Sequence, residues 1–404
     1  MGKLRDDVSG HDTITLTKGS TVTIHTTEDW ANAGSISTDL YIDYGNLHQS
    51  LSNGSKVLLD DGAISMTVIS VESDKQFHGT VTCTVDNTGE LRSRAGVNLP
   101  GAETDLPAMS TKDKIDIRYG MTFDIDYIAA SFVQNADGVK EIRRYTSEVA
   151  NELGWDVSYP LPRIISKIES ASALQNFDEI LAESDGIMVA RGDLGVEIPI
   201  HQVTNAQKEM IAACNAVGKP VIVATQMLES MAKNPRPTRA EVSDVSNAVF
   251  DGADAVMTSG ETAKGKYPIE TIKMMNEIIL SAERFSLIRP DLVGRDRPLF
   301  SHSRQPGVKG DTGGIEASVA KAAVAAASKR GAVAILVLLT VESDLARLLA
   351  AYRPDVPVVV FAPSAKIARQ LVRYFRSFCN LFSLDLVWRI LYKDVSFSLR
   401  PLLR

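Results

Sequence analysis

Cysteine is scarce in this chain, and long apolar runs do not occur in it. Only three cysteines are present among 404 residues, Cys83, Cys214 and Cys379, and their separations match no metal-binding pattern. They argue against a disulfide framework and favour a reducing compartment. The longest apolar runs, such as residues 332–339, are far too short to span a bilayer. No basic-then-apolar leader opens the sequence. We therefore expect a cytoplasmic protein without a membrane segment.

Other features are missing as well. The six histidines show no ligand spacing, and there are no internal repeats or low-complexity blocks. The net charge of -7 argues against general nucleic-acid binding. What is present is the composition of a globular enzyme, 44% hydrophobic and 23% charged. The length of 404 residues is sufficient for two or three domains.

Residues 1–106 are predicted to form a small all-β domain. Alternating, β-branched segments such as 13–17 and 21–25 are separated by turn residues, which is typical of a small sandwich or barrel. The segment Gly96-Val97-Asn98-Leu99-Pro100-Gly101 then signals a loop.

From residue 107 to residue 285 the pattern changes to helices alternating with short apolar strands. This alternation predicts an α/β domain with a parallel sheet. The five expected strands cover residues 127–133, 164–169, 186–190, 220–225 and 255–259. Helices are expected between them and over residues 269–284.

The remainder of the chain is predicted to be a linker and an open α/β domain. Residues 286–314 are rich in Arg, Pro, Gly, Asp and Ser without an apolar period, as in a linker. Residues 315–404 begin with a helix over 315–329. Strands over 332–339 and 356–361 and helices over 342–352 and from 366 follow. The segment after residue 374 has no clear period.

Polar residues stand at the ends of the predicted parallel strands. Lys167 and Glu169 are two residues apart, so they share one face of their strand. The carboxyl ends of strands in βα-repeat proteins carry the chemistry. A cation and carboxylates gathered there suit stabilisation of an oxyanion beside a metal. A purely structural ion pair of Lys167 with Glu169 or Asp193 is the alternative.

Several motifs at these ends resemble those of the pyruvate kinase family. They are Lys167-Ile168-Glu169, residues 185–195 with Arg191-Gly192-Asp193, residues 224–231, which begin with Ala224-Thr225, residues 235–241, which run from Pro235 to Glu241, and residues 259–265 with Glu261. Their order makes chance similarity very improbable. The resemblance implies an incomplete (β/α)8-type (TIM) barrel, with an inserted all-β cap domain and a C-terminal open α/β domain.

The resemblance also implies a reaction and roles for individual residues. The reaction is phosphoryl transfer from phosphoenolpyruvate to ADP, giving pyruvate and ATP. Lys167 matches the lysine that contacts the transferring phosphoryl group, while Glu169 and Asp193 match the ligands of Mg²⁺, which Mn²⁺ can replace. Gly192 and Asp193 would bind the substrate carboxylate, and Thr225 would lie beside the enol carbon. A homotetramer is the family's usual assembly.

The cap and the C-terminal domain depart from the family in places. Asp61 matches the acidic tip of the cap. Ala95 stands where a lysine is usual and Arg94 lies one residue earlier, so a nucleotide contact at this point would depart from the family pattern. Residues 340–344 contain Glu342 and Asp344 and no glycine, which argues against a sugar-bisphosphate effector there. Glu261 is expected to support the site or contact nucleotide, with a solvent-facing carboxylate as the alternative.

Both ends depart from the family too. Its members begin with three further barrel strands, which supply K⁺ ligands and a phosphate-binding arginine, and the five strands counted here agree with their absence. We therefore expect an incomplete gene model or a degenerate paralogue, and poor turnover of the chain as written. Two rival functions stay open: a Mg²⁺-dependent pyruvate lyase or aldolase, and a non-catalytic binding protein.

Overall fold

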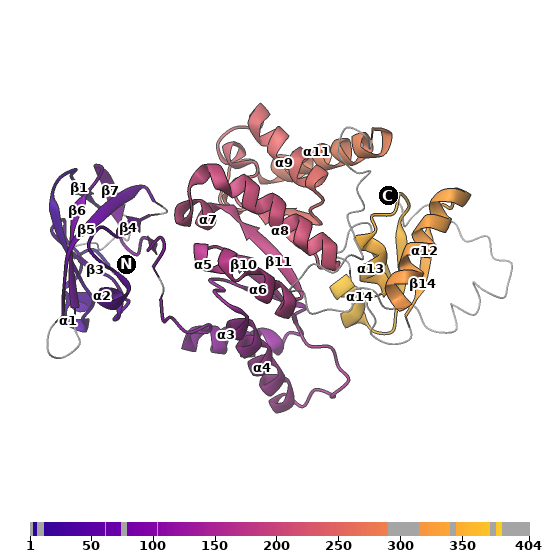
Figure 1. Cartoon of the computed structure of the whole chain (residues 1–404), viewed down its shortest axis with the longest axis horizontal. Helices are drawn as coiled ribbons and strands as arrows, with labels where there is room; N and C mark the ends of the chain where they lie inside the picture. The colour runs from indigo at the N-terminus through magenta and orange to yellow at the C-terminus, as the bar shows by residue number, and fades with distance from the viewer. Residues whose placement is uncertain are drawn as a thin grey trace.

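The structure is a computed structural model. It describes residues 3–5, 12–60, 62–73, 79–102, 104–289, 315–339, 345–371 and 377–381. Figure 1 shows three bodies in chain order: a β domain, a central parallel sheet with its helices, and a C-terminal α/β domain. No helix in these ranges is long and apolar enough to cross a membrane.

The N-terminal domain is built on a six-stranded sheet with the order β3-β2-β6-β5-β4-β8, beside a β1–β7 pair. Its strands are β1 (Thr13–Leu16), β2 (Thr21–His25), β3 (Asp39–Tyr41), β4 (Lys56–Leu59), β5 (Ile64–Ser73), β6 (Gly79–Val85), β7 (Gly89–Arg92) and β8 (Val97–Asn98). Buried and partly buried residues alternate along β6 because successive side chains face opposite sides. Two short helices, α1 (Glu28–Ala33) and α2 (Leu47–Ser50), were not predicted.

The central domain contains five parallel strands in the order β13-β12-β11-β10-β9. They are β9 (Tyr127–Ala130), β10 (Arg163–Ile168), β11 (Gly186–Ala190), β12 (Val221–Ala224) and β13 (Ala255–Met257). All five strands predicted for this region are confirmed. The first ends earlier than predicted, because the chain turns at Phe132, whose φ is +54°.

Helices connect these strands and cover the sheet (Figure 1). They are α3 (Thr111–Met121), α4 (Ala136–Glu152), α5 (Ala171–Gln175), α6 (Phe177–Glu183), α7 (Arg191–Glu197), α8 (Val203–Val217), α9 (Arg239–Asp251), α10 (Gly260–Ala263) and α11 (Pro268–Ile288). The 3₁₀ turns η1 (Ile200–Gln202) and η2 (Glu229–Ala232) complete the connections. Capping boxes begin α3 at Ser110 and α9 at Thr238, which satisfies otherwise unpaired backbone amides.

Both faces of the central sheet are buried. Ile187, Val189 and Val223 belong to the large cluster that packs against the helices, whereas Met188 and Ile222 lie in a smaller cluster on the other face. A parallel sheet needs both faces covered, which explains why β11 is buried along its whole length. Within the described residues, β9 and β13 each pair with one neighbour, so the sheet is a partial barrel.

The C-terminal domain holds a parallel sheet in the order β14-β15-β16. Its elements are α12 (Ile315–Arg330), β14 (Ile335–Leu338), α13 (Leu345–Ala351), β15 (Val358–Ala362), α14 (Ala365–Leu371) and β16 (Ser377–Leu381). The open α/β prediction is confirmed, and β16 is a strand in the segment for which no period was found. α11 continues past the predicted start of the linker at residue 286, and the predicted effector loop at 340–344 lies outside the described residues.

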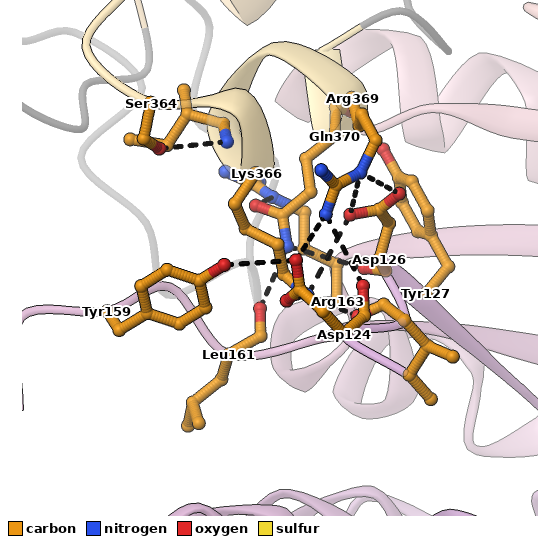
Figure 2. A network of polar contacts seen from close by, with 12 residues as sticks. Asp124, Asp126, Tyr127, Tyr159, Leu161, Arg163, Ser364, Lys366, Arg369 and Gln370 are labelled. Atoms are coloured by element: carbon orange, nitrogen blue, oxygen red, sulfur yellow. Dashed lines mark hydrogen bonds and ion pairs between the residues drawn. The ribbon is translucent and has the colours of Figure 1, made fainter. Parts of the chain in front are cut away.

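The C-terminal domain contacts the amino ends of the central strands through a dense polar network (Figure 2). The Lys366 ammonium lies 2.8 Å from an Asp124 oxygen and 3.7 Å from Asp126. Arg369 binds both carboxylates, Asp126 through its Nε at 2.8 Å and Asp124 at 2.6 Å. Gln370 contacts the backbone at Asp126 and the side chain of Arg163, where β9 and β10 begin.

Further along the same edge, two more arginines join the domains. Arg347 donates to the carbonyls of Val217 and Gly218, just before β12. Arg353 lies 2.7 Å from Asp254, just before β13. The C-terminal domain therefore docks on the amino edge of the sheet through charge.

The buried ammonium of Lys366 makes this contact sensitive to loss of a partner. Its side chain is fully buried, whereas that of Asp124 is 37% exposed. Burial alone would raise the pKa of Asp124, but hydrogen bonds from Lys366, Arg369 and Tyr159 outweigh it and lower the pKa. Stabilisation from Asp124 is therefore complete above its ordinary pKa and is lost as pH falls through the lowered folded-state value.

We predict that Asp124→Asn destabilises the protein by about 3 kcal/mol, because it leaves a buried ammonium short of a charge partner. Lys366→Met should cost less, because Asp124 and Asp126 are partly exposed and both keep Arg369 as a charge partner. Urea unfolding at pH 7 measures both changes. Asp116→Asn, which breaks the exposed Lys112–Asp116 pair, is the control and should change stability by less than about 0.5 kcal/mol. Equal losses of unfolding free energy in Asp124→Asn and in this control would show that Asp124 does not compensate the buried Lys366 ammonium.

Candidate active site

The residues predicted from the strand ends gather at the carboxyl edge of the central sheet. β10, β11 and β12 are neighbours in register, with Ile168 opposite Val189 and Ala190 opposite Ala224. Glu169 directly follows β10, Arg191 directly follows β11 and Thr225 directly follows β12. The parallel direction of the strands therefore brings these side chains to the same edge, opposite the C-terminal domain.

Lys167 and Glu169 form an ion pair with 2.6 Å between the ammonium nitrogen and Oε1. The Glu169 side chain is 2% exposed and that of Lys167 is 23% exposed. Lys167 also donates to the Ser131 hydroxyl at 2.9 Å, and the Phe132 N–H donates to Glu169 Oε2. The loop after β9 thus orients Lys167 of β10 and Glu169, which directly follows it. The carboxylate is held inside while the ammonium stays accessible.

Gly192 and Asp193 lie in the first turn of α7. The Gly192 N–H donates to the Thr225 hydroxyl at 2.7 Å. A Cβ added at Gly192 would lie 3.4 Å from that hydroxyl oxygen, an ordinary van der Waals contact. A substrate carboxylate at Gly192 would have to share this N–H with Thr225. Asp193 is partly buried at the same edge.

Thr225 occupies an unusual backbone conformation. Its φ is +70° and that of Gln226 is +53°, so two consecutive residues other than glycine are left-handed. A β-branched residue rarely adopts this conformation. The Thr225 hydroxyl donates to the Ala224 carbonyl at 2.6 Å and accepts from Gly192. This turn reverses the chain directly after the strand and fixes the direction of the hydroxyl.

Arg191 contacts this turn, and sequence reasoning assigned it no role. Its guanidinium donates to the carbonyls of Thr225 at 2.7 Å and Ala224 at 3.3 Å. It also forms an ion pair with Asp244 at 2.7 Å. The signal in the sequence was an arginine directly after a fully buried strand, where an unpaired charge would be costly.

Glu261 and Glu241 support the loops around the site. Glu261 is completely buried and accepts from the N–H groups of Leu228 at 3.2 Å and Ser259 at 2.8 Å. The solvent-facing alternative for Glu261 is therefore wrong. Glu241 accepts from Ser230 and Thr238; these hydrogen bonds lower its pKa although burial opposes them.

The cap approaches the central domain near α7. Gly62 of the cap faces Val196 of α7, since a Cβ at Gly62 would lie 3.6 Å from it. The Glu197 carboxyl accepts from Asn98 of β8 in the cap, and burial raises the pKa of Glu197. Arg94 is exposed with a φ of +59°, so its side chain points to solvent from a turn. Asp61 lies outside the described residues.

A cavity of about 960 Å³ extends between the cap connection and the carboxyl edge. Its lining includes Asn98, Thr104, Ser131, Phe132 and Glu197. Ser131 and Phe132 are the residues that hold Lys167 and Glu169. The cavity therefore adjoins the loop that holds the ion pair, whereas Lys167 and Glu169 themselves are not part of its lining.

The donor set at this edge fits a magnesium ion. Glu169 and Asp193 offer hard carboxylate oxygens, and Mg²⁺ uses one or two carboxylates with water and substrate oxygens. No group of three or more His, Cys, Asp or Glu side chains suited to a metal occurs in the part of the chain that the structure describes. A site completed by substrate and water is consistent with this finding.

Two family models match this chain. The model for the pyruvate kinase barrel domain matches residues 3–272, and that for the pyruvate kinase alpha/beta domain matches residues 317–383. A pyruvate kinase of Agaricus bisporus is 48% identical over 82% of this chain and 58% of its own length. One of Candida albicans is 46% identical over 86% of this chain and 64% of its own length.

A solved structure agrees. The crystal structure of a pyruvate kinase from Cryptosporidium parvum matches with a TM-score of 0.81 and 34% identity, over 96% of this chain and 75% of that one. The chain spans less than two thirds of the length of the Agaricus and Candida proteins. Sequence and fold thus agree over most of its residues, and the chain belongs to the pyruvate kinase family.

Proposed function

We propose that this chain carries out phosphoryl transfer from phosphoenolpyruvate to ADP, forming pyruvate and ATP. The observation that carries the proposal is the Lys167–Glu169 pair, a buried carboxylate and an accessible ammonium at the carboxyl edge of a partial barrel. Family membership supports the reaction class. The carboxyl edge of such a sheet is where barrel enzymes place their chemistry.

In this proposal the cationic and the anionic side chains have different roles. In the reaction the bond between the phosphorus and the enol oxygen breaks, and a bond to a terminal oxygen of ADP forms. Lys167 would lie against the transferring group and neutralise its charge, which is the main task in phosphoryl transfer. Glu169 and Asp193 would hold Mg²⁺, which when bound neutralises charge on phosphate and enolate oxygens.

The second half of the reaction is proton transfer to the enolate carbon. Thr225 would stand beside this carbon and pass on a proton through water. The backbone around Gly192 and Asp193 would hold the substrate carboxylate. Because the Thr225 hydroxyl already accepts from the Gly192 N–H, substrate binding and hydroxyl orientation would be linked at this point.

Several further features belong to the same proposal. Mn²⁺ would be able to take the place of Mg²⁺, and K⁺ would need ligands from the family's three further barrel strands. The cap, residues 1–106, would contact the nucleotide through Asp61 and Arg94. Residues 107–285 would form the catalytic domain, joined by the linker 286–314 to the C-terminal domain 315–404. A homo-oligomer and a cytoplasmic location stay predictions.

Lys167→Met is predicted to reduce ADP-dependent pyruvate formation by roughly 10³-fold, because a charge contact in the transition state is typically worth about 3–4 kcal/mol. A coupled assay for pyruvate measures the loss relative to the parent, which is the chain with the family's three further barrel strands restored, since poor turnover is expected of the chain as written. Lys112→Met, which changes a lysine that is 80% exposed on α3, is the control and should keep the parent rate. A loss of less than about tenfold in Lys167→Met would remove Lys167 from the reaction.

For the metal, we predict that Glu169→Gln and Asp193→Asn each weaken Mn²⁺ binding by roughly tenfold or more, since each removes one of two charged ligands. Electron paramagnetic resonance titration with Mn²⁺ measures this directly. Asp193→Asn should also weaken substrate binding. Asp137→Asn, which alters an exposed carboxylate on α4, should leave both unchanged. Unaltered Mn²⁺ affinity in both site variants would place the metal elsewhere.

The same assay separates the rival functions. Pyruvate formed only with both phosphoenolpyruvate and ADP supports the kinase reaction. Pyruvate released from a larger keto acid without ADP would favour a lyase or aldolase. A folded version with the three further barrel strands restored that forms no pyruvate in either case would favour the non-catalytic alternative and contradict the proposal.

A further inference from the structure

We propose that Arg191 is a positioning residue that holds Thr225 in its reactive orientation, an inference that rests on the proposed function. Arg191 is the first residue of α7, at the end of β11, and it reaches across to the end of β12. Its guanidinium meets the two backbone carbonyls on either side of the Thr225 turn. No contact between Arg191 and a reacting atom is needed for this role.

The turn requires such support because its conformation is unfavourable by itself. Thr225 and Gln226 have φ values of +70° and +53°. Strained conformations of this kind persist only when their surroundings impose them, and they concentrate at functional sites. Arg191 NH2 donates to the Thr225 carbonyl at 2.7 Å and Nε donates to that of Ala224 at 3.3 Å. The restraint therefore acts on the two consecutive peptide groups that flank the strained residue Thr225.

A planar fork of donors is suited to this task, and an ammonium is not. Arg191 uses Nε, NH1 and NH2 in different directions, and NH2 also lies 2.8 Å from the Met227 sulfur. Lysine carries the same charge but presents its donors from one point on a flexible stem. Arg191→Lys thus keeps the charge and removes the geometry.

Arg191 is itself held in place. Its side chain is 11% exposed, and its NH1 lies 2.7 Å from Asp244 on α9 and 3.3 Å from the Gln207 amide oxygen on α8. The Asp244 carboxylate offsets the charge that burial would otherwise penalise. Two helices therefore aim the guanidinium at the turn.

Two contacts connect the end of β11 with the end of β12. The side chain of Arg191 binds the backbone of Thr225, while the next amide, Gly192 N–H, binds the side chain of Thr225. The Thr225 hydroxyl accepts from the Gly192 N–H and donates to the Ala224 carbonyl, and these two bonds fix its direction. In the proton step, the enolate carbon gains a proton through this hydroxyl, and solvent replaces it. A displaced turn would misdirect that transfer.

The first test measures how firmly the Thr225 turn is held and does not depend on catalytic activity. Hydrogen–deuterium exchange of the full chain is compared between the parent and Arg191→Lys. The Gly192 amide and the segment 225–228 should exchange at least tenfold faster in the variant, while β10 is unchanged. Arg143→Lys is the matched control, because Arg143 also joins two elements, through Asp185 at 3.0 Å, at the opposite edge. Unchanged exchange at 192 and 225–228 in Arg191→Lys would overturn the proposal.

The second test measures the proton-transfer step. NMR monitors the exchange of the pyruvate methyl protons with deuterated solvent. Arg191→Lys should slow this exchange by roughly 10²-fold, the loss typical of a misplaced group. In a Thr225→Val background the same change should cost less than threefold, because the hydroxyl that Arg191 positions is already gone. Full additivity of the two losses would show that Arg191 does not act through Thr225.

The two proposals fail separately. A parent chain that catalyses neither pyruvate proton exchange nor ADP-dependent pyruvate formation would contradict the proposed function. The positioning of the turn by Arg191 would then be decided by hydrogen–deuterium exchange alone.

Discussion

The parallel direction and register of β9 to β13 determine what each edge of the sheet can do. Their carboxyl ends bring Lys167, Glu169, Arg191 and Thr225 together, while their amino ends meet the C-terminal domain. β10 shows both ends of this arrangement. Arg163 at its start contacts Gln370 of α14, and Lys167 lies near its end. A shift of this strand would disturb the interdomain contact and the site at once.

Paired charge is the second recurring feature. Lys167 with Glu169, Arg191 with Asp244 and Lys366 with Asp124 each join a cation to a carboxylate, and in each pair one of the two side chains is largely buried. Burying such a charge alone would be costly, whereas a pair with further hydrogen bonds is tolerated. Each pair also joins different structural elements or fixes a loop. The charges therefore set positions as much as they contribute to stability, which suits a reaction that depends on positioning.

Much of this arrangement could be predicted from the sequence because it is encoded locally. The five central strands are short, continuous apolar runs, and the two-residue spacing of Lys167 and Glu169 correctly predicted a shared face. Contacts between distant residues could not be predicted this way. Arg191 meets Thr225 and Asp244 from 34 and 53 positions away, and the burial of Glu261 depends on the turn after β12. The roles in the reaction stay predictions for all the residues proposed: Lys167, Glu169, Gly192, Asp193, Thr225 and Arg94, and Asp61 outside the described residues.

The central claim is that Lys167, Glu169 and Asp193 together bind a metal and an enolate at the carboxyl edge. A crystal structure with Mn²⁺ and oxalate, a planar dianion that resembles the enolate of pyruvate, tests it most directly. The account predicts Mn²⁺ at about 2.1 Å from carboxylate oxygens of Glu169 and Asp193. It also places the Lys167 ammonium within hydrogen-bonding distance of oxalate. Mn²⁺ and oxalate bound away from these three residues would contradict it.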